Sequence, residues 1–134
     1  MKRTWFVNLH PLARLSLIFG FLFLCLGVLL GAFGAHALKN MVEASKLITF
    51  ETGIRYHFYH ALGLVLVGLI QQVFQNLKLR LPIYFFVFGI LLFSFNCYFY
   101  VLSGVKIFAM IVPLGGILLV LGWMFLLRTF LKFR

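Results

Sequence analysis

The stretch LSLIFGFLFLCLGVLLGAFGA, residues 15–35, contains no charged side chain and decides the class of fold. As a helix it would extend about 30 Å, which is the thickness of the hydrocarbon core of a bilayer. Its end, with Ala35, His36 and Ala37, also has the small-x-small spacing of a signal peptidase site. A signal peptide has an apolar core of about 7 to 15 residues, so this longer run favours a permanent membrane helix over a cleaved leader.

The composition supports the same class of protein. Hydrophobic residues make up 64% of the chain and charged residues only 10%, which excludes an ordinary water-soluble fold. The net charge of +10 would suggest nucleic acid as a partner of a soluble protein. Here the Lys and Arg side chains lie between apolar runs, where they anchor membrane segments, so we expect no nucleic-acid partner. Cys25 and Cys97 lie inside apolar runs and are interpreted as small buried hydrophobes.

Three further segments have the length of a membrane span. Residues 82–102 and 107–127 are free of charge, and residues 56–74 are apolar except for two histidines and two glutamines. Each is long enough to cross a bilayer as a helix. The sequence therefore predicts an all-α membrane protein with four transmembrane helices in a single domain over residues 1–134.

Basic residues in the connections predict how the four spans are oriented. If the N-terminus is cytoplasmic, the cytoplasmic side carries Lys2, Arg3, Arg14, Lys78, Arg80, Arg128, Lys132 and Arg134. The outer side then carries Lys39, Lys46, Arg55 and Lys106, together with both acids, Glu43 and Glu51. Because the larger basic set belongs on the cytoplasmic side, both termini are predicted to be cytoplasmic.

The connection over residues 38–50 is the longest one and joins the first two spans on the outer side. Leu38, Met41, Val42 and Ile48 recur in it at helical spacing, with charged residues between them. This pattern predicts a short helix lying in the membrane interface.

Polar residues of the spans are expected to gather near the outer face. In the second span, His57, His60 and Gln71 fall within an arc of about 80°, and this stripe should face the bundle because unpaired polar groups in lipid are costly. The predicted cluster comprises His36, His57, His60, Gln71, Asn96 and Tyr100. Asn96 needs a partner inside the bundle, for which His57 or His60 is the best candidate. The cluster either fixes helix packing or forms a solvent-lined or ligand-binding site.

Glu51 and Arg55 fall on the other side of the second span, four residues apart and with the acid first, which is the favourable order for an ion pair. Arg55 can reach the lipid headgroups, and Tyr56 and Tyr59 suit the aromatic belt of a membrane interface. The pair is interpreted as an interfacial anchor rather than as catalytic chemistry.

Glycines on the predicted spans indicate where helices approach closely. Gly27 and Gly31 have the small-xxx-small spacing that lets two backbones meet, and Gly115 and Gly116 follow Pro113 early in the fourth span. The predicted packing positions are Gly27, Gly31, Gly34, Gly53, Gly115, Gly116 and Gly122.

Four short motifs occur in order on the four predicted spans. They consist of Gly31, Ala32, Phe33, Gly34, Ala35 and His36; Thr52, Gly53, Tyr56, His60 and Ala61; Phe93 and Ser94; and Pro113, Gly115, Gly116, Gly122 and Trp123. Together they resemble the family catalogued as domain of unknown function 423, the YgdD-like small inner-membrane proteins, over about residues 21–123. The resemblance implies a four-helix protein of the bacterial inner membrane without an established activity. The chain departs from the family pattern at Phe95 and Asn96, because a small residue usually follows the Phe-Ser pair.

No acid lies within a predicted span, and no Ser-His-acid or zinc-protease spacing is present. We therefore expect no enzymatic activity, no metal site and no cofactor. His36 and His60 are expected at similar depth on different spans, an arrangement that can ligate a haem iron, but two histidines alone support this only weakly.

Two classes of function remain. The favoured one is a structural or accessory protein that binds lipid, copies of itself or a larger membrane partner through its glycine-lined faces. The other is transport of a small solute, ion or proton through the polar cluster, which would need an oligomer because four short helices enclose little volume. The lipid bilayer is the partner common to both.

Overall fold

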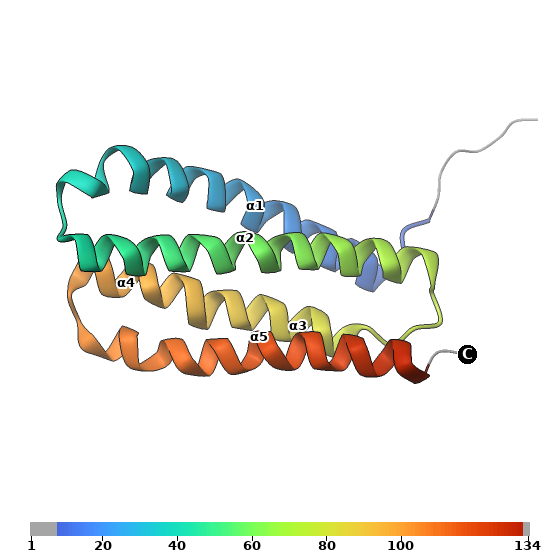
Figure 1. Ribbon diagram of the computed structural model, residues 1–134. Coiled ribbons are helices and arrows are strands. Elements are labelled where there is room, and N and C mark those ends of the chain that lie inside the picture. Colours follow the sequence, from blue (N-terminus) through green and yellow to red (C-terminus); the bar gives the residue numbers. More distant parts are fainter. Residues whose placement is uncertain (1–7, 133–134) are drawn as a thin grey trace, which may run out of the picture.

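The computed structural model describes residues 8–132, and every regular element among them is helical (Figure 1). Four segments of this part of the chain are long and apolar enough to cross a membrane: Pro11–Asn40, Ala44–Val73, Arg80–Ser103 and Lys106–Lys132. Each predicted span overlaps one of these segments along most of its length. The prediction of an all-α fold with four membrane-length helices is therefore confirmed.

Helix α1 (Pro11–His36) begins where the sequence supplies both a cap and a proline. His10 Nδ1 accepts a hydrogen bond from the backbone N–H of Leu12 at 3.2 Å, which satisfies one of the free donors of the first turn. Proline fits the first turn because its missing N–H has no partner there in any helix. A short 3₁₀ turn, η1 (Leu38–Asn40), follows the end of α1.

Helix α2 (Ala44–Val73) begins much earlier than the predicted span at residue 56. The predicted loop over residues 38–50 is thus shorter, and its only separate helical turn is η1 within the described chain. The cause is packing, since Leu38 and Phe50 are each only 1% exposed and join Tyr98 in one apolar cluster. This segment continues the bundle instead of lying flat in the interface.

The third span is one helix with an irregular middle. It consists of α3 (Arg80–Ile90), the π-helical turn η2 (Leu91–Phe95) and α4 (Asn96–Ser103). It ends at Gly104, whose φ of 72° lies in the left-handed region that glycine adopts without strain. Helix α5 (Lys106–Lys132) follows directly and completes the bundle.

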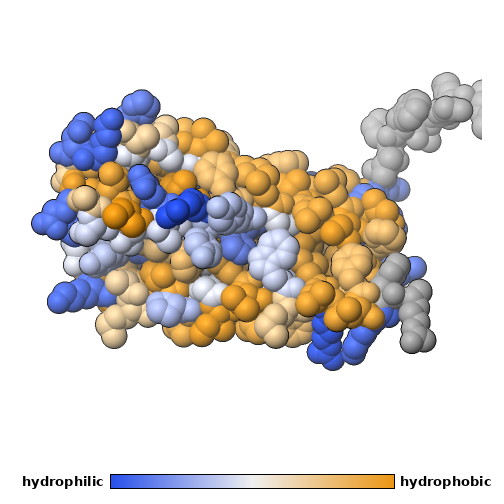
Figure 2. All heavy atoms as spheres, in the orientation of Figure 1, coloured by the Kyte–Doolittle hydropathy of each residue, from blue (hydrophilic) through white to orange (hydrophobic). Residues whose placement is uncertain are grey.

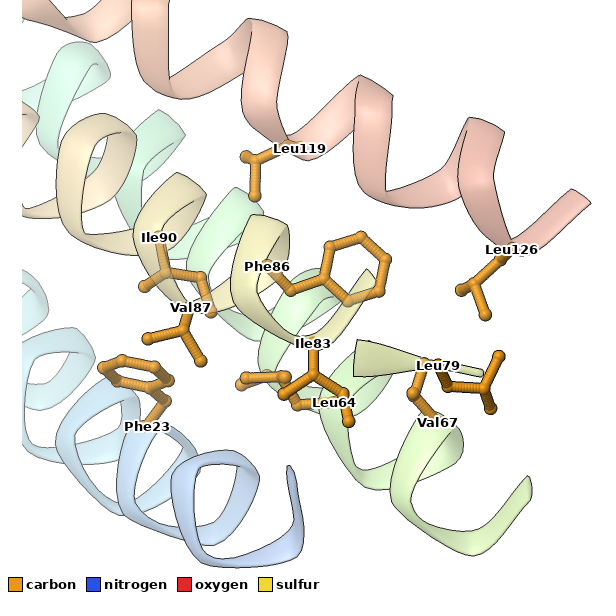
Figure 3. Close-up of a cluster of buried hydrophobic side chains, with 11 residues drawn as sticks. Phe23, Leu64, Val67, Leu79, Ile83, Phe86, Val87, Ile90, Leu119 and Leu126 are labelled. Atoms are coloured by element: carbon orange, nitrogen blue, oxygen red, sulfur yellow. The ribbon is translucent and has the colours of Figure 1, made fainter. Parts of the chain in front are cut away.

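The helices are arranged in the order of the chain. Helix α1 packs chiefly on α2, and α5 packs chiefly on α3 and η2, so α1 and α5 form opposite flanks (Figure 1). A buried apolar cluster joins all four spans (Figure 3). It includes Phe23 of α1, Leu64 and Val67 of α2, Ile83, Phe86 and Ile90 of α3, and Leu119 and Leu126 of α5.

Large hydrophobic side chains cover the outside of the bundle as well. Leu29 is 62% exposed on α1 and Met110 is 71% exposed on α5. Figure 2 shows hydrophobic residues over much of one face, with hydrophilic residues at its two ends and a band of more polar residues that extends from the loop side into the middle. A surface of this kind is suited to lipid rather than to water.

The two ends of the bundle are named here by what they carry. The termini end holds the first turn of α1, the α2–α3 connection and the last turn of α5, whereas the loop end holds the α1–α2 and α4–α5 connections (Figure 1). Of the basic residues assigned to the cytoplasmic side, Lys2, Arg3 and Arg134 lie outside the described residues.

Candidate functional site

His60 connects α2 to α5 in the interior of the bundle. Its Nδ1 lies 2.7 Å from the carbonyl oxygen of Tyr56, and the indole N–H of Trp123 points to its Nε2 at 3.0 Å. A carbonyl only accepts and an indole N–H only donates, so these contacts fit a neutral imidazole with its hydrogen on Nδ1. Both ring nitrogens are satisfied, and the side chain is 5% exposed. His60 therefore has the bonding of a packing residue.

His57 lies one turn earlier on α2 and is fully buried. Its Nδ1 is 3.0 Å from the hydroxyl of Tyr98 on α4, and the ring of Phe23 meets the imidazole edge-on at 5.6 Å between centroids. His57 Nε2 and Ser94 Oγ make no hydrogen bond of good geometry, although the imidazole lies against the backbone of Phe23 and Ser94 lies beside the Tyr98 hydroxyl. His57 thus joins three spans through one hydrogen bond and aromatic packing.

Asn96 lies at the start of α4, directly after the π-helical turn. Its Nδ2 donates to the carbonyl oxygens of Leu91 at 3.2 Å and Leu92 at 3.0 Å. A π turn shifts the hydrogen-bond register, and the amide supplies donors to the carbonyls that the shift affects. The expected bond from Asn96 to His57 or His60 is therefore wrong, because the side chain is used within its own span.

Gln71 is fully buried, but it lies at the termini end. Its Nε2 donates to the carbonyl oxygen of Leu77 at 3.0 Å, and its Oε1 accepts from the backbone N–H of Leu79 at 3.3 Å. A single amide therefore closes the α2–α3 connection. The prediction that Gln71 belongs to a cluster near the outer face is wrong. The polar stripe extends along α2 beyond the two central histidines, and Gln71 lies at its far end.

His36 and Tyr100 also lie apart from the two central histidines. His36 is exposed at the last residue of α1, where its backbone carbonyl accepts from Asn40 Nδ2 at 3.4 Å. Tyr100 is half-buried and packs against the apolar cluster around Leu38. Their expected place in the polar cluster is therefore wrong. The haem arrangement also loses its basis, because His36 is at a helix end and both nitrogens of His60 are engaged.

Glu51 and Arg55 are both exposed on α2, but they form no ion pair in the described chain. The guanidinium Nη2 of Arg55 instead donates to Thr52 Oγ1 at 3.2 Å. The spacing had predicted an interfacial pair, and the structure places both side chains on the rim of a cavity instead. The two opposite charges therefore lie beside the same cavity without forming an ion pair.

Close approaches between helices occur at five of the seven predicted glycines. A Cβ atom built on any of them would come within about 3.1 Å of a neighbouring span, which is tighter than ordinary contact. These positions are Gly27, Gly34, Gly53, Gly115 and Gly122. Gly31 and Gly116 have ordinary room, with nearest atoms at 3.9 Å and 3.6 Å. Equally close contacts occur at Gly20, Gly68 and Gly89, which were not among the predicted packing positions.

The closest approach of one of these glycines to another backbone lies beside the π-helical turn. A Cβ on Gly115 of α5 would overlap the backbone at Leu92 and Phe93. Two main chains therefore touch directly, although the sequence departs from the family pattern two residues later, at Phe95. Backbone-to-backbone contact of this kind is how glycine joins membrane helices.

Three cavities open on the surface away from the central histidines. One, of about 310 Å³, lies between α1 and α2 near the loop end, and the others lie beside Arg14 and Arg128 at the termini end. Within residues 8–132, no three His, Cys, Asp or Glu side chains come together as metal ligands. The centre of the bundle is packed and hydrogen-bonded, and the surface provides the open space.

The helices, their exposed apolar faces and the comparisons with known proteins define a polytopic α-helical membrane protein. The chain belongs to the family described as protein of unknown function (DUF423), whose model matches residues 30–116. It is 35% identical over 120 residues to a UPF0382 membrane protein of Staphylococcus epidermidis, covering 90% of this chain and 98% of that one. It is 32% identical over 121 residues to the UPF0382 membrane protein YwdK of Bacillus subtilis, with the same coverage. No solved structure matches the chain.

Two partners of the central histidines were not predicted as site residues. Tyr98 bonds to His57, and Trp123 bonds to His60. An indole N–H inside an apolar run needs an acceptor, which is the signal that could have identified Trp123. Tyr98 and Tyr100 are two residues apart, and without the position of the π turn the sequence does not indicate which one faces α2.

Proposed function

We propose that this protein is a non-catalytic structural or accessory component of a bacterial inner membrane, and that its buried polar side chains hold its own helices together. The observation that carries the proposal is the Tyr56–His60–Trp123 chain of hydrogen bonds, which satisfies both imidazole nitrogens across two helices. A histidine that binds a proton or a ligand needs one nitrogen free for it. His60 has neither nitrogen free.

Other buried polar groups support the same role. Gln71 forms hydrogen bonds with the backbone of the α2–α3 connection, and Asn96 donates hydrogen bonds to backbone carbonyls of its own span. Neither side chain lines any of the three cavities. Buried polar groups that already have partners within the protein favour packing over a path for solutes.

The proposed orientation has both termini in the cytoplasm of a bacterial cell. Arg14, Lys78, Arg80, Arg128 and Lys132 belong to the termini end, and the bacterial relatives are named as membrane proteins. The test introduces a single cysteine into each connection, Asn40→Cys or Asn76→Cys. A membrane-impermeant thiol reagent on intact cells is expected to label the Asn40→Cys variant above wild type and to leave the Asn76→Cys variant unlabelled. The reverse pattern would overturn the orientation.

The functional test compares folding with flux. Purified wild type and the His60→Ala variant are reconstituted in liposomes containing a pH-sensitive dye, and a proton gradient is imposed. We expect both to match empty liposomes, while His60→Ala melts at a lower temperature in detergent. Proton entry through wild type that His60→Ala abolishes would establish transport instead.

The accessory role also predicts a partner. Cross-linking in native membranes, followed by extraction in mild detergent, should recover one partner in fixed stoichiometry with this chain. Recovery of self-assembled chains alone would count against an accessory role and leave a self-contained structural protein.

Transport through an oligomer is the second candidate, and one observation favours it. His57 Nε2 and Ser94 Oγ are buried without a hydrogen bond of good geometry, so the centre of the bundle retains two polar atoms that a small guest could engage. The same liposome assay with His57→Phe decides between the candidates, because this variant removes both imidazole nitrogens and keeps an aromatic ring. Wild-type flux equal to that of empty liposomes, or wild-type flux that His57→Phe leaves unchanged, would exclude this path for protons.

A further inference from the structure

The cavity near the loop end is an open slot between the last turns of α1 and the first half of α2. It has a volume of about 310 Å³. The two helices touch at Gly34, where the Phe50 ring fills the space above the glycine. One turn away, Gly31 has only an ordinary contact with Ile54, so the helices part and leave an apolar trough between them.

Two opposite charges stand on the rim of this trough. Glu51 and Arg55 both line it, one turn apart on α2, and no ion pair joins them. The one hydrogen bond of the Arg55 side chain goes to Thr52, which leaves the guanidinium with free donors. A carboxylate and a guanidinium that face the same opening without pairing form a site for a ligand with both charges.

The depth of this rim in a membrane follows from the length of α2. Thirty residues of helix extend about 45 Å, which exceeds the roughly 30 Å of hydrocarbon. Counting about 20 residues back from Gln72, near the termini end, places the other boundary of the hydrocarbon near Gly53. Glu51 and Arg55 therefore lie on either side of the edge of the hydrocarbon, where the headgroup region begins.

We propose that this slot binds one phospholipid whose headgroup carries both a phosphate and a primary ammonium, as phosphatidylethanolamine does. The phosphate accepts hydrogen bonds from Arg55, which is the side chain suited to phosphate. The ammonium, joined to the phosphate by two carbons, reaches Glu51 about one helical turn away. The first part of an acyl chain lies in the trough along Gly31 and Ile54.

This chemistry separates three common lipids. Phosphatidylglycerol offers the phosphate without an ammonium, so Glu51 remains unpaired beside it. Phosphatidylcholine offers a trimethylated nitrogen that has no N–H to donate. The site goes beyond the proposed structural role, which needs no lipid ligand, so the two proposals fail independently.

The test titrates the detergent-purified protein with the three lipids, all with the same acyl chains, and counts bound lipid by native mass spectrometry. Wild type is expected to bind phosphatidylethanolamine about fivefold more tightly than either of the others, as for one added charge-assisted contact. Glu51→Gln should remove this preference without weakening phosphatidylglycerol. Arg55→Gln should weaken all three lipids. Equal affinity of wild type for the three lipids would overturn the proposal.

The chain offers a matched pair of variants for the apolar part of the slot. Gly31→Leu fills the trough and should weaken every lipid, whereas Ala32→Leu places the same side chain on an exposed neighbour outside the cavity and should leave binding unchanged. Melting temperatures identify any variant that fails to fold. If Gly31→Leu fails to fold, the lipid preference of the exposed Glu51→Gln variant tests the site on its own. Displacement of the lipid by millimolar inorganic phosphate would show a site for free anions and overturn the lipid assignment.

Discussion

The middle of α2 and its first half both carry polar side chains within a membrane protein, but they use them differently. In the middle, His60 bonds on one side to its own helix and on the other to Trp123. In the first half, Glu51 and Arg55 share a cavity rim and do not bond to each other. Most polar groups of the interior are hydrogen-bonded, whereas the two charges at the edge are not paired with each other.

This difference follows from the surroundings of each region. Inside the bundle no water replaces a missing partner, so an unpaired polar group is costly and most such groups are bonded. At the interface, water and lipid headgroups solvate charges, so Glu51 and Arg55 need no internal partner. Substitutions in the two regions should therefore affect different measurements, stability in the centre and ligand binding at the rim.

The largest effect is expected where main chains touch. Gly115→Ala places a methyl group against the backbone of Leu92 and Phe93, which cannot move aside as a side chain can. We expect a loss of about 3 kcal/mol in unfolding free energy, measured by denaturation in detergent. Gly116→Ala is the matched control, because its nearest atom is 3.6 Å away, and it should be nearly neutral. Equal stability of the two variants would show that α5 does not approach the π turn so closely.

The next effect tests the central hydrogen bonds. Trp123→Phe removes the indole donor and leaves His60 Nε2 without a partner, which should cost about 2 kcal/mol. The double-mutant cycle with His60→Ala, measured by the same denaturation, should give a coupling of about 0.6 kcal/mol or more. Strictly additive effects would mean that the two side chains do not bond.

A smaller effect is expected at the termini end. Gln71→Ala removes the partners of the Leu77 carbonyl and of the buried Leu79 N–H, and the loss of these neutral hydrogen bonds should cost about 1 kcal/mol. Gln75→Ala changes an exposed glutamine in the same connection and serves as the control. Thermal melting in detergent compares the pair, and an equal loss in both would remove the assigned role of Gln71.

The smallest effect on stability is expected at the rim. Glu51→Gln removes an exposed charge that has no ion pair, so the melting temperature should stay within about 2 °C of wild type. The binding of phosphatidylethanolamine should nevertheless fall. A clear loss of stability together with unchanged lipid binding would reverse the distinction between the two regions.

Sequence patterns predicted the helices well and the partners of polar residues poorly. Long uncharged runs and the arc of polar residues on α2 require only local geometry, so the four spans and the burial of His57, His60 and Gln71 were predicted. The π turn changes the register of the third span, and it decides that Tyr98 rather than Tyr100 meets His57. Nothing local in the sequence marks this turn.

The packing of α2 on its neighbours was equally difficult to predict. Residues 38–50 were predicted as a connection with a short helix of its own, yet residues 44–50 belong to α2, because Phe50 is buried against α1 and α4. Tertiary contacts extended the helix beyond the apolar run. Gln71 was placed in the wrong cluster for a related reason. Residues that share a helix face point in the same direction, but they can lie at different depths along the helix.

The most direct test of a dry, bonded centre is hydrogen exchange at the Trp123 indole in lipid bilayers. Nitrogen-15 NMR after transfer to deuterated water follows this N–H, and the indole of Trp5, which lies outside the described residues, is assigned separately by Trp5→Phe. The hydrogen bond to His60 predicts exchange that is slow and becomes much faster in His60→Ala. Rapid exchange in wild type would mean that water reaches His60, and would contradict a purely structural role for the central polar residues.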